Sequence, residues 1–425
     1  MRFRKTVLPN GLRLVTVPRT DSKAVTVLFL VKVGSRQESS SINGISHFIE
    51  HLMFKGTEKR PTTLDISKAL DQVGAEYNAF TGKDHTGYYI TVNKAKTRLA
   101  LDILSDMLQN SKFDSKELER ERTVIIEEIN MYEDNPMMYV EEIFEQLFYG
   151  KNHPLGQLIA GPRSVIRKVS RADMMRYIGK HYSARNSVLA VAGAIDKTLM
   201  KQAKELFGGI GSGSAPKRFS QASHRQTAPR LKVLEKKTEQ IQICLGFPGL
   251  SYTNSQYPAL ELLSVILGGN MSSRLFINIR ERLGLAYFVK ASANAYEDSG
   301  TFAIQAGLDK KRFVKAVAAI LKEVTMVKNE GVTEDELKKA RDFLRGKMVL
   351  GLEDSSSLAS WAGKMETFDH EILTPEQRYA QYRKVTPSQI QKLANRLFLP
   401  KWLNVAVIGS AGNPAALRQI IRQPF

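Results

Sequence analysis

The sequence has 425 residues, of which 43% are hydrophobic and 25% are charged, and this is typical of a soluble globular protein with two domains. A single cysteine, Cys244, excludes an intramolecular disulfide bond, disfavours a thiolate metal site and fits a reducing compartment. The sequence has neither a signal-like N-terminal segment nor an apolar run of membrane-spanning length. We therefore expect a cytoplasmic protein with no membrane partner.

The net charge of +19 at pH 7 would suit a nucleic-acid-binding protein. However, the basic residues are spread over both halves of the sequence and form no basic arm. They are accompanied by no glycine-rich phosphate loop, paired-cysteine motif or basic-aromatic run. We therefore interpret the charge as a contribution to solubility and expect no nucleic-acid partner.

The first half of the sequence alternates predicted strands and helices. Asn10-Gly11 lies between two alternating runs and predicts a hairpin within residues 1–19. A buried strand is expected at residues 24–33, and an amphipathic helix at residues 44–54. The other expected elements are a helix at 61–74, strands at 76–81 and 85–92, helices at 94–109, 116–133, 137–148 and 172–180, a strand at 187–191 and a helix at 196–207.

The segment after Phe207 is rich in glycine and serine, then polar and basic without periodicity, which is typical of a linker. Beyond it the pattern repeats with a period of about 210 residues. The repeated elements are strands at 240–247, 286–295, 300–308 and 403–408, with helices at 256–267 and from residue 413. We predict an α+β protein with two homologous domains, each a mostly antiparallel mixed sheet with helices on one face. The expected boundaries are residues 1–208, a linker at 209–230 and residues 231–425.

The helix at residues 44–54 carries His47, Glu50 and His51 within a narrow arc of one face. Two imidazoles four residues apart can hold one Zn²⁺, and a neighbouring carboxylate can take a proton from a water on the metal. The order His-x-x-Glu-His is the inverse of the common His-Glu-x-x-His motif of zinc peptidases. The alternative is that the three side chains only form a solvated polar face.

A catalytic zinc site uses three protein ligands and keeps one position open. The glutamate-rich helix at 116–133 is the expected source of the third ligand. On a helical wheel Glu128 lies at the edge of the apolar stripe, whereas Glu127 points the other way, so we expect Glu128 to bind the metal. Glu121, two turns earlier, would orient a ligand or the water. The alternative is a glutamate-rich helix that is simply solvated.

The second half is not expected to bind this metal. Its helix at residues 256–267 replaces the histidine motif with Pro258, Glu261 and Ser264, and it contains no histidine. The metal chemistry is therefore expected in the first half only.

These motifs resemble the pitrilysin family of zinc metallopeptidases, specifically its half-length members related to the beta subunit of the mitochondrial processing peptidase. The resemblance extends over the whole chain. The matching motifs are Asn10-Gly11-Leu12, residues 47–57 (HFIEHLMFKGT), 78–81 (NAFT) and 84–86 (DHT), Glu121 with Glu128, and residues 132–136 (YEDNP), 273–276 (SRLF) and 280–287 (RERLGLAY).

The resemblance implies a zinc endopeptidase with one Zn²⁺ per chain. His47, His51 and Glu128 would be the zinc ligands, and Glu50 would be the general base. These assignments agree with the roles expected from the residues themselves.

The resemblance also implies that Arg280 and Tyr287 bind the substrate main chain and the developing oxyanion. A cation and a phenol aimed at the scissile carbonyl would stabilise charge that appears only in the transition state. The alternative is an ordinary helix arginine and a core tyrosine.

The substrates implied by the resemblance are peptides or unfolded protein segments, held in an enclosed chamber of a homodimer, or of a heterodimer with a related chain. An edge strand formed by Asn78, Ala79, Phe80 and Thr81 would pair with an extended peptide. The alternative function is a non-catalytic peptide-binding or structural core-type subunit of the same family.

Overall fold

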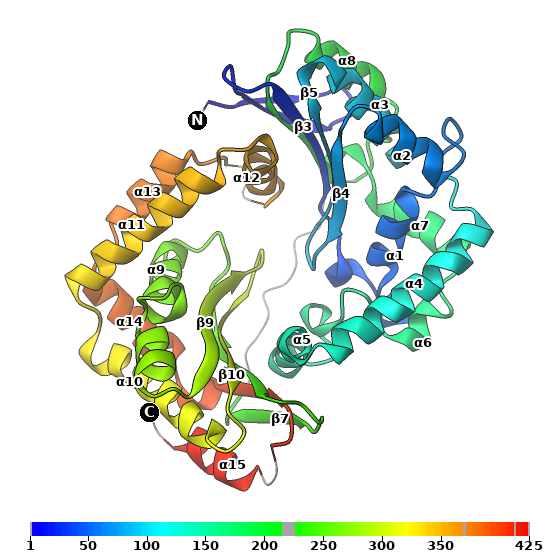
Figure 1. Cartoon of the computed structure of the whole chain (residues 1–425). Coiled ribbons are helices and arrows are strands. Elements are labelled where there is room, and N and C mark those ends of the chain that lie inside the picture. The colour runs from blue at the N-terminus through cyan, green and yellow to red at the C-terminus, as the bar shows by residue number, and fades with distance from the viewer. Residues whose placement is uncertain (1, 215–225, 369–370, 412–413, 424–425) are drawn as a thin grey trace. The chain divides into compact units, whose positions relative to one another are not determined.

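The computed structural model describes residues 2–214, 226–368, 371–411 and 414–423. Its residues form two compact units, and neither unit is continuous in sequence (Figure 1). The first unit consists of Met1–Ile129, Gln157–Arg218 and Met348–Pro375. The second unit consists of Asn130–Gly156, Phe219–Lys347 and Glu376–Phe425.

The first unit is built on a six-stranded mixed sheet with the order β1-β2-β6-β3-β5-β4. Neighbouring strands are antiparallel except β2 and β6, which are parallel. The predicted Asn10-Gly11 hairpin is confirmed as the β1–β2 connection, where Gly11 has a φ of 92°. The strands are β1 (Arg4–Val7), β2 (Arg13–Pro18), β3 (Ala24–Val31), β4 (Glu76–Thr81), β5 (Thr86–Asn93) and β6 (Ser187–Gly193).

Both faces of the first sheet are covered. On one face the apolar stripes of α1, α3 and α8 pack against alternate strand residues such as Val27 and Phe29. On the other face α12 packs on β2, β3 and β6, where its Gly363 allows close approach to Leu30 and Ala190. Because both faces are covered, β3 is buried along almost its whole length. The helices of this unit are α1 (Ile45–Met53), α2 (Thr63–Asp71), α3 (Thr97–Asn110), α6 (Arg163–Ile166), α7 (Arg171–His181), α8 (Leu199–Phe207) and α12 (Ser355–Phe368), with short 3₁₀ turns η1 (Ser35–Gln37), η2 (Ser40–Ile42), η3 (Lys94–Lys96) and η5 (Ala184–Asn186).

The second unit repeats the first. Its five-stranded sheet has the order β7-β11-β8-β10-β9, with β7 and β11 parallel and the other neighbours antiparallel. This order and these directions match those of β2-β6-β3-β5-β4, so the predicted duplication is confirmed. The strands are β7 (Arg230–Leu234), β8 (Ile241–Pro248), β9 (Ala286–Ala295), β10 (Gly300–Leu308) and β11 (Asn404–Ile408).

The second sheet is also covered by a helix from the other half of the sequence. Helix α5 packs on β7, β8 and β11, and its Phe144 and Phe148 lie in a cluster with Cys244 and Ala406. The remaining helical elements of this unit are α9 (Tyr257–Gly268), α10 (Phe313–Glu330), α13 (Pro375–Arg383), α14 (Pro387–Leu397) and α15 (Ala415–Arg422), the π-helix η6 (Phe276–Arg282), and the 3₁₀ turns η4 (Pro154–Gly156) and η7 (Pro400–Trp402), while α5 spans Pro136–Tyr149.

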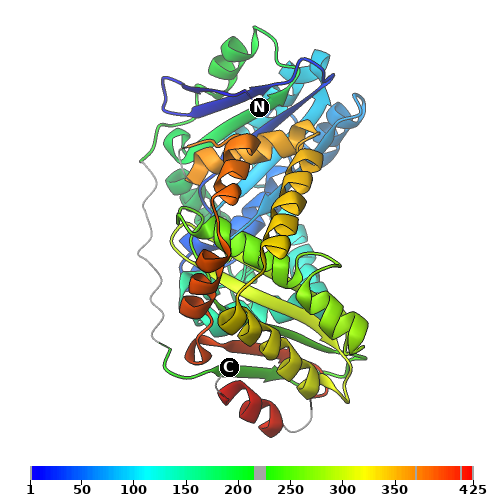
Figure 2. The same ribbon diagram turned by 90° about the vertical axis from the view of Figure 1, so that its left-hand side faces the viewer.

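Two long helices connect the units in sequence. Helix α4 (Ser115–Asp134) begins in the first unit and ends in the second, whereas α11 (Glu334–Gly351) begins in the second and ends in the first. Helix α5 follows α4 and packs on the second sheet, whereas α12 follows α11 and packs on the first sheet (Figure 1). Figure 2 shows the orange helix α12 beside the blue and green strands of the first sheet.

The structure therefore differs from the expected division into residues 1–208 and 231–425. Helix α5 lies in the second unit and α12 in the first, because each packs on a sheet whose strands are distant in sequence. In the expected linker at 209–230, residues 215–225 lie outside the described residues, and Arg230 already belongs to β7.

Candidate metal centre

Helix α1, which carries the histidine motif, begins with an unusual cap. Gly44 precedes the helix with a φ of 98° and has no side chain to cap it. The carboxylate of Glu38 takes this role by accepting hydrogen bonds from the backbone N–H groups of Gly44 (2.6 Å) and Ser46 (2.8 Å). Burial raises the pKa of Glu38 to about 7, although these N–H donors act in the opposite direction. Sequence reasoning missed this residue, because nothing in the local pattern distinguishes it from an ordinary loop glutamate.

His47, His51 and Glu128 converge on one point. Glu128 Oε2 lies 3.6 Å from His47 Nε2 and 3.4 Å from His51 Nε2, and one ligand atom from each residue lies within 4.8 Å of the others. Two ligand atoms of a tetrahedral zinc at the usual bond lengths are about 3.3–3.6 Å apart. The side chains of His47, His51 and Glu128 are only 10%, 20% and 23% exposed, respectively. They therefore do not form the solvated polar face that the alternative interpretation requires. This donor set and its spacing fit Zn²⁺.

Helix α4 supplies the carboxylates with the phase expected from its apolar stripe. Glu128 faces the two histidines, whereas Glu127 is exposed. One face of α4 therefore carries both Glu128 and Glu121.

Glu121 and Lys55 orient His51. Glu121 Oε2 lies 3.1 Å from His51 Nδ1, and Lys55 Nζ lies 2.6 Å from Glu121 Oε1. With the Nδ1 proton directed to Glu121, the Nε2 lone pair of His51 is left for a metal. The lysine offsets one negative charge in a site that contains three carboxylates. Lys55 was not singled out from the sequence, where it follows the motif as an ordinary basic residue.

In the metal-free protein the two histidines have opposite pKa shifts. Burial lowers the pKa of His47, and the neighbouring His51 lowers it further. Burial also disfavours charged His51, but its hydrogen bonds with Glu121 and Glu128 outweigh this effect and raise its pKa to about 9. The hydrogen bond with His51 also lowers the pKa of Glu128. Of the two histidines, His51 is therefore the one whose surroundings favour the protonated form in the metal-free protein.

Glu50 lies beside the histidines on α1 and contacts the edge strand of the sheet. Thr81 Oγ1, at the end of β4, donates a hydrogen bond to Glu50 Oε2. Burial raises the pKa of Glu50, and the Thr81 hydrogen bond partly opposes that rise. The carboxyl group is thus a candidate proton acceptor with one oxygen already engaged.

The predicted edge strand is present. β4 pairs with β5 on one side only, from Glu76↔Thr91 to Thr81↔Thr86, and no strand of the described residues lies on its outer side. Asn78, Ala79 and Phe80 belong to this strand.

Arg280 and Tyr287 belong to the second unit, where they lie together. The Arg280 guanidinium carbon is 4.8 Å from the ring centroid of Phe276 and 5.7 Å from that of Tyr287. Tyr287 is 72% exposed, so the alternative of a core tyrosine does not apply. Arg280 lies on the π-helix η6, a rare element that is frequent at functional sites.

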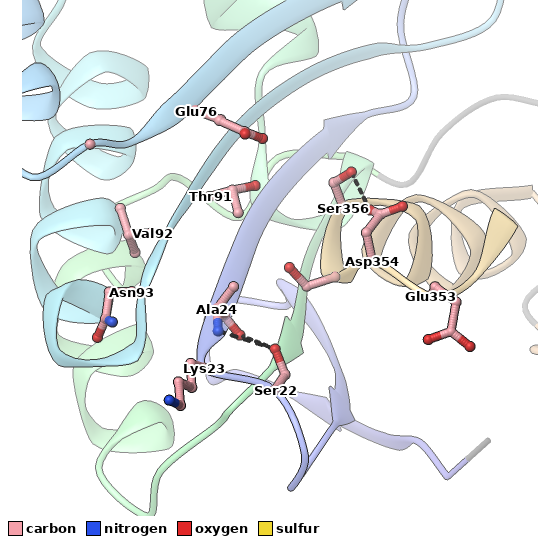
Figure 3. Close-up of a pocket in the computed structure, with 12 residues that line it drawn as sticks. Ser22, Lys23, Ala24, Glu76, Thr91, Val92, Asn93, Glu353, Asp354 and Ser356 are labelled. Carbon is pink, nitrogen blue, oxygen red and sulfur yellow. Dashed lines mark hydrogen bonds between the residues drawn. The ribbon is translucent and has the colours of Figure 1, made fainter. Parts of the chain in front are cut away.

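A cavity of about 520 Å³ lies at the opposite end of β4 from Thr81 (Figure 3). In Figure 3, Glu76 and Thr91 line one side of it, and Asp354 and Ser356 line another. Asp354 is engaged by its own helix, since it accepts hydrogen bonds from the backbone N–H of Ser357 (2.7 Å) and from Ser356 Oγ (2.6 Å). A strand of six residues, about 3.3 Å each, separates this cavity from Thr81, so it is not the metal centre.

In the part of the chain that the structure describes, His47, His51 and Glu128 are the one group of three or more His, Cys, Asp or Glu side chains close enough to share a metal. Within the same residues, no helix is both long and apolar enough to cross a membrane.

Two family models match this chain. Residues 13–163 match the family model described as "Insulinase (Peptidase family M16)", and residues 168–344 match "Peptidase M16 inactive domain". An uncharacterized zinc protease of Streptomyces coelicolor is 36% identical over 98% of this chain and 91% of its own length. One of Bacillus subtilis is 34% identical over 95% of this chain and 97% of its own length.

The fold has close counterparts among solved structures. A protease from Helicobacter pylori aligns with a TM-score of 0.88 at 22% identity, and the alignment covers 96% of this chain and 99% of that one. At this low sequence identity the structural likeness shows the fold alone, whereas the sequence relatives show the family. The chain belongs to the M16 (insulinase or pitrilysin-like) family of peptidases, as the resemblance of its motifs had indicated.

Proposed function

We propose that this chain is a zinc-dependent endopeptidase that cleaves peptides or unfolded protein segments. The observation that carries the proposal is the convergence of His47 Nε2, His51 Nε2 and Glu128 Oε2 beside the carboxylate of Glu50, which is not one of the converging groups. Three protein ligands with one open position is the composition of a catalytic zinc site, whereas structural zinc sites use four.

Each side chain of the site has a distinct task in this proposal. A bound Zn²⁺ would polarise the scissile carbonyl and lower the pKa of water, which is the chemistry that a metal supplies to hydrolysis. Glu50 accepts the proton of the attacking water and later delivers it to the leaving amine. Glu121 holds the Nδ1 proton of His51, so that the ring keeps one tautomer and one orientation.

We further propose that the substrate binds as an added strand on β4. No strand of the described residues pairs with the outer edge of β4, where an extended peptide could pair, although the backbone N–H of Ala79 donates to Asn78 Oδ1 at 2.8 Å. Recognition through the main chain would make the enzyme tolerant of side-chain sequence and selective for extended, unfolded segments. Thr81 brings the end of this strand to Glu50, which supports cleavage near that end.

Arg280 and Tyr287 are proposed to bind the substrate carbonyl. Tyr287 is exposed, and the guanidinium of Arg280 lies 5.7 Å from its ring centroid and 3.8 Å from a carboxylate oxygen of Glu281, so the pair presents a phenol hydroxyl and a cation to a ligand. Both groups stabilise negative charge on a carbonyl oxygen.

We propose that the active form is a dimer in which each site takes Glu50 from one chain and Arg280 from the other. Mixing the inactive variants Glu50→Gln and Arg280→Ala under conditions of random subunit exchange would make about half of the dimers mixed. One of the two sites in each mixed dimer would be intact, so roughly a quarter of wild-type activity would be restored. Verified exchange without recovered activity would contradict the shared site and leave the zinc assignment untouched.

The proposed function is tested by metal analysis together with mass spectrometry of a digested library of unstructured peptides. We expect one zinc per chain and cleavage of many library members that stops on addition of a chelator. Stoichiometric zinc without any cleavage would favour the alternative, a non-catalytic peptide-binding or core-type subunit.

A further inference from the structure

The hydrogen bond between Thr81 and Glu50 joins two features that were assigned separately, the edge strand and the proposed base. Glu50 lies on α1, and Thr81 is the last residue of β4. The hydroxyl of Thr81 donates to Oε2 of Glu50, and among the described residues the Glu50 carboxylate accepts its hydrogen bond from this group. The other oxygen, Oε1, is left to accept a proton.

The backbone of Thr81 is fixed by its surroundings. Thr81 pairs with Thr86 of β5, whose own hydroxyl donates to the backbone carbonyl of Val33 at 2.8 Å in the buried interior. The turn that follows is closed by the hydrogen bond from Gly82 N to His85 O at 2.8 Å. A threonine side chain also has restricted χ1 freedom because it is β-branched. The hydroxyl therefore has a defined position from which to hold a carboxylate.

Glu50 needs such a partner. A glutamate has three side-chain torsions, and a general base acts efficiently only when its oxygen is aimed at the proton that it takes. The contacts of His47 and His51 with Glu128 and Glu121 do not involve the side chain of Glu50.

We propose that Thr81 is a positioning residue, whose hydroxyl holds the Glu50 carboxylate in place. The strand that pairs with the peptide, β4, then also orients the base that acts on it. This inference rests on the proposed peptidase function and deepens it. It assigns Thr81 a role through its side chain, in addition to the main-chain pairing expected of the strand.

The test compares Thr81→Val, which keeps the shape and removes the hydroxyl, with Thr81→Ser, which keeps the hydroxyl. In Thr81→Val we expect kcat to fall roughly 10- to 100-fold while KM changes by less than about threefold and bound zinc is unchanged. In Thr81→Ser we expect kcat within about threefold of wild type. This split between kcat and KM, with rescue by serine, is not expected from a general loss of structure.

The matched control is Thr91→Val, the same substitution on β5. Thr91 Oγ1 makes a 2.8 Å hydrogen bond with Thr26 Oγ1, far along the sheet from Glu50. We expect Thr91→Val to leave kcat and KM within about twofold of wild type. An equal loss of kcat in this variant would overturn the proposal, because the effect would then belong to the sheet and not to Thr81.

A second measurement does not depend on turnover. Crystal structures of the zinc-loaded proteins should show the Glu50 carboxylate in one position in wild type and Thr81→Ser, and displaced in Thr81→Val. An undisplaced Glu50, a wild-type kcat in Thr81→Val, or equal loss in Thr81→Ser would each overturn the role of Thr81. If wild type cleaves nothing, the proposed function fails, while these structures still decide whether Thr81 holds Glu50.

Discussion

The two units have sheets with the same order and directions of five strands, but the helix that follows the central strand differs between them. In the first unit, β3 leads to α1, where His47 and His51 meet Glu128. In the second unit, β8 leads to α9, which is buried along almost its whole length. The charged residue of α9 is Glu261, which lies 3.2 Å from Arg378 and accepts a 3.0 Å hydrogen bond from Tyr382.

The comparison shows that the fold alone does not provide the metal site. The same place in the two units is occupied by a candidate metal-binding cluster in one case and by an ion pair in the other. The difference arises from a few side chains on α1 and α4, so the chemistry belongs to these residues. The following predictions test whether the side chains of α1 and α4 carry the chemistry and the shared fold does not, from the largest expected effect to the smallest.

The largest effect is expected from neutralising the glutamate of α1. Glu50→Gln should lower kcat roughly 10²- to 10⁴-fold with zinc retained, because the amide cannot accept a proton while both imidazoles remain. Glu261→Gln on α9 is the matched variant and should leave kcat unchanged. Peptide cleavage assays at equal zinc content make the comparison, and near wild-type turnover by Glu50→Gln would refute the assigned base.

The next effect concerns zinc affinity. Glu128→Gln removes a ligand and should weaken zinc binding by more than the roughly 10- to 100-fold typical of an outer-shell partner. Glu127→Gln, one residue earlier on the exposed side of α4, should leave the affinity unchanged. Competition with a chelator measures both, and the reverse order of affinities would show that Glu127 is the ligand.

Zinc binding should also depend on pH. The pKa of His51 is raised to about 9 in the metal-free protein, so zinc must displace a proton at any lower pH. The apparent affinity should therefore rise about tenfold per pH unit from pH 6 to 8 and level off above pH 9. Glu121→Gln removes one cause of the raised pKa, so the apparent affinity should level off at a lower pH in this variant. Chelator competition at several pH values measures it, and a pH-independent wild-type affinity would contradict the account.

The smallest effect concerns the caps of the two helices. Glu38→Ala removes the carboxylate that caps α1 and should lower the free energy of unfolding by about 1–2 kcal/mol. Gln256 precedes α9 without a capping side-chain hydrogen bond, so Gln256→Ala should change stability much less. Urea denaturation compares the two variants, and equal effects would argue against a special role for Glu38.

Much of this organisation could be predicted from the sequence. The histidine motif, the edge strand at 76–81 and the repeat are encoded by local spacing and periodicity, and the helical phase of α4 separated Glu128 from Glu127. The sequence did not predict that α5 belongs to the second unit and α12 to the first, because each helix packs against strands that are distant in sequence.

The supporting contacts of the site were also missed. Glu38 and Lys55 lie in or beside loops, and their partners depend on how the chain folds back on itself. The contact of Thr81 with Glu50 depends on where β4 ends relative to α1, which no periodic pattern specifies. Such contacts require the three-dimensional register of the elements.

The most direct test of the central claim is a zinc titration of the metal-free protein, with peptide cleavage followed by mass spectrometry. If the cluster of His47, His51 and Glu128 carries the chemistry, cleavage should be absent without zinc, rise in proportion to added zinc and saturate at one zinc per chain. Cleavage by the metal-free protein, or no cleavage at one bound zinc per chain, would contradict the account.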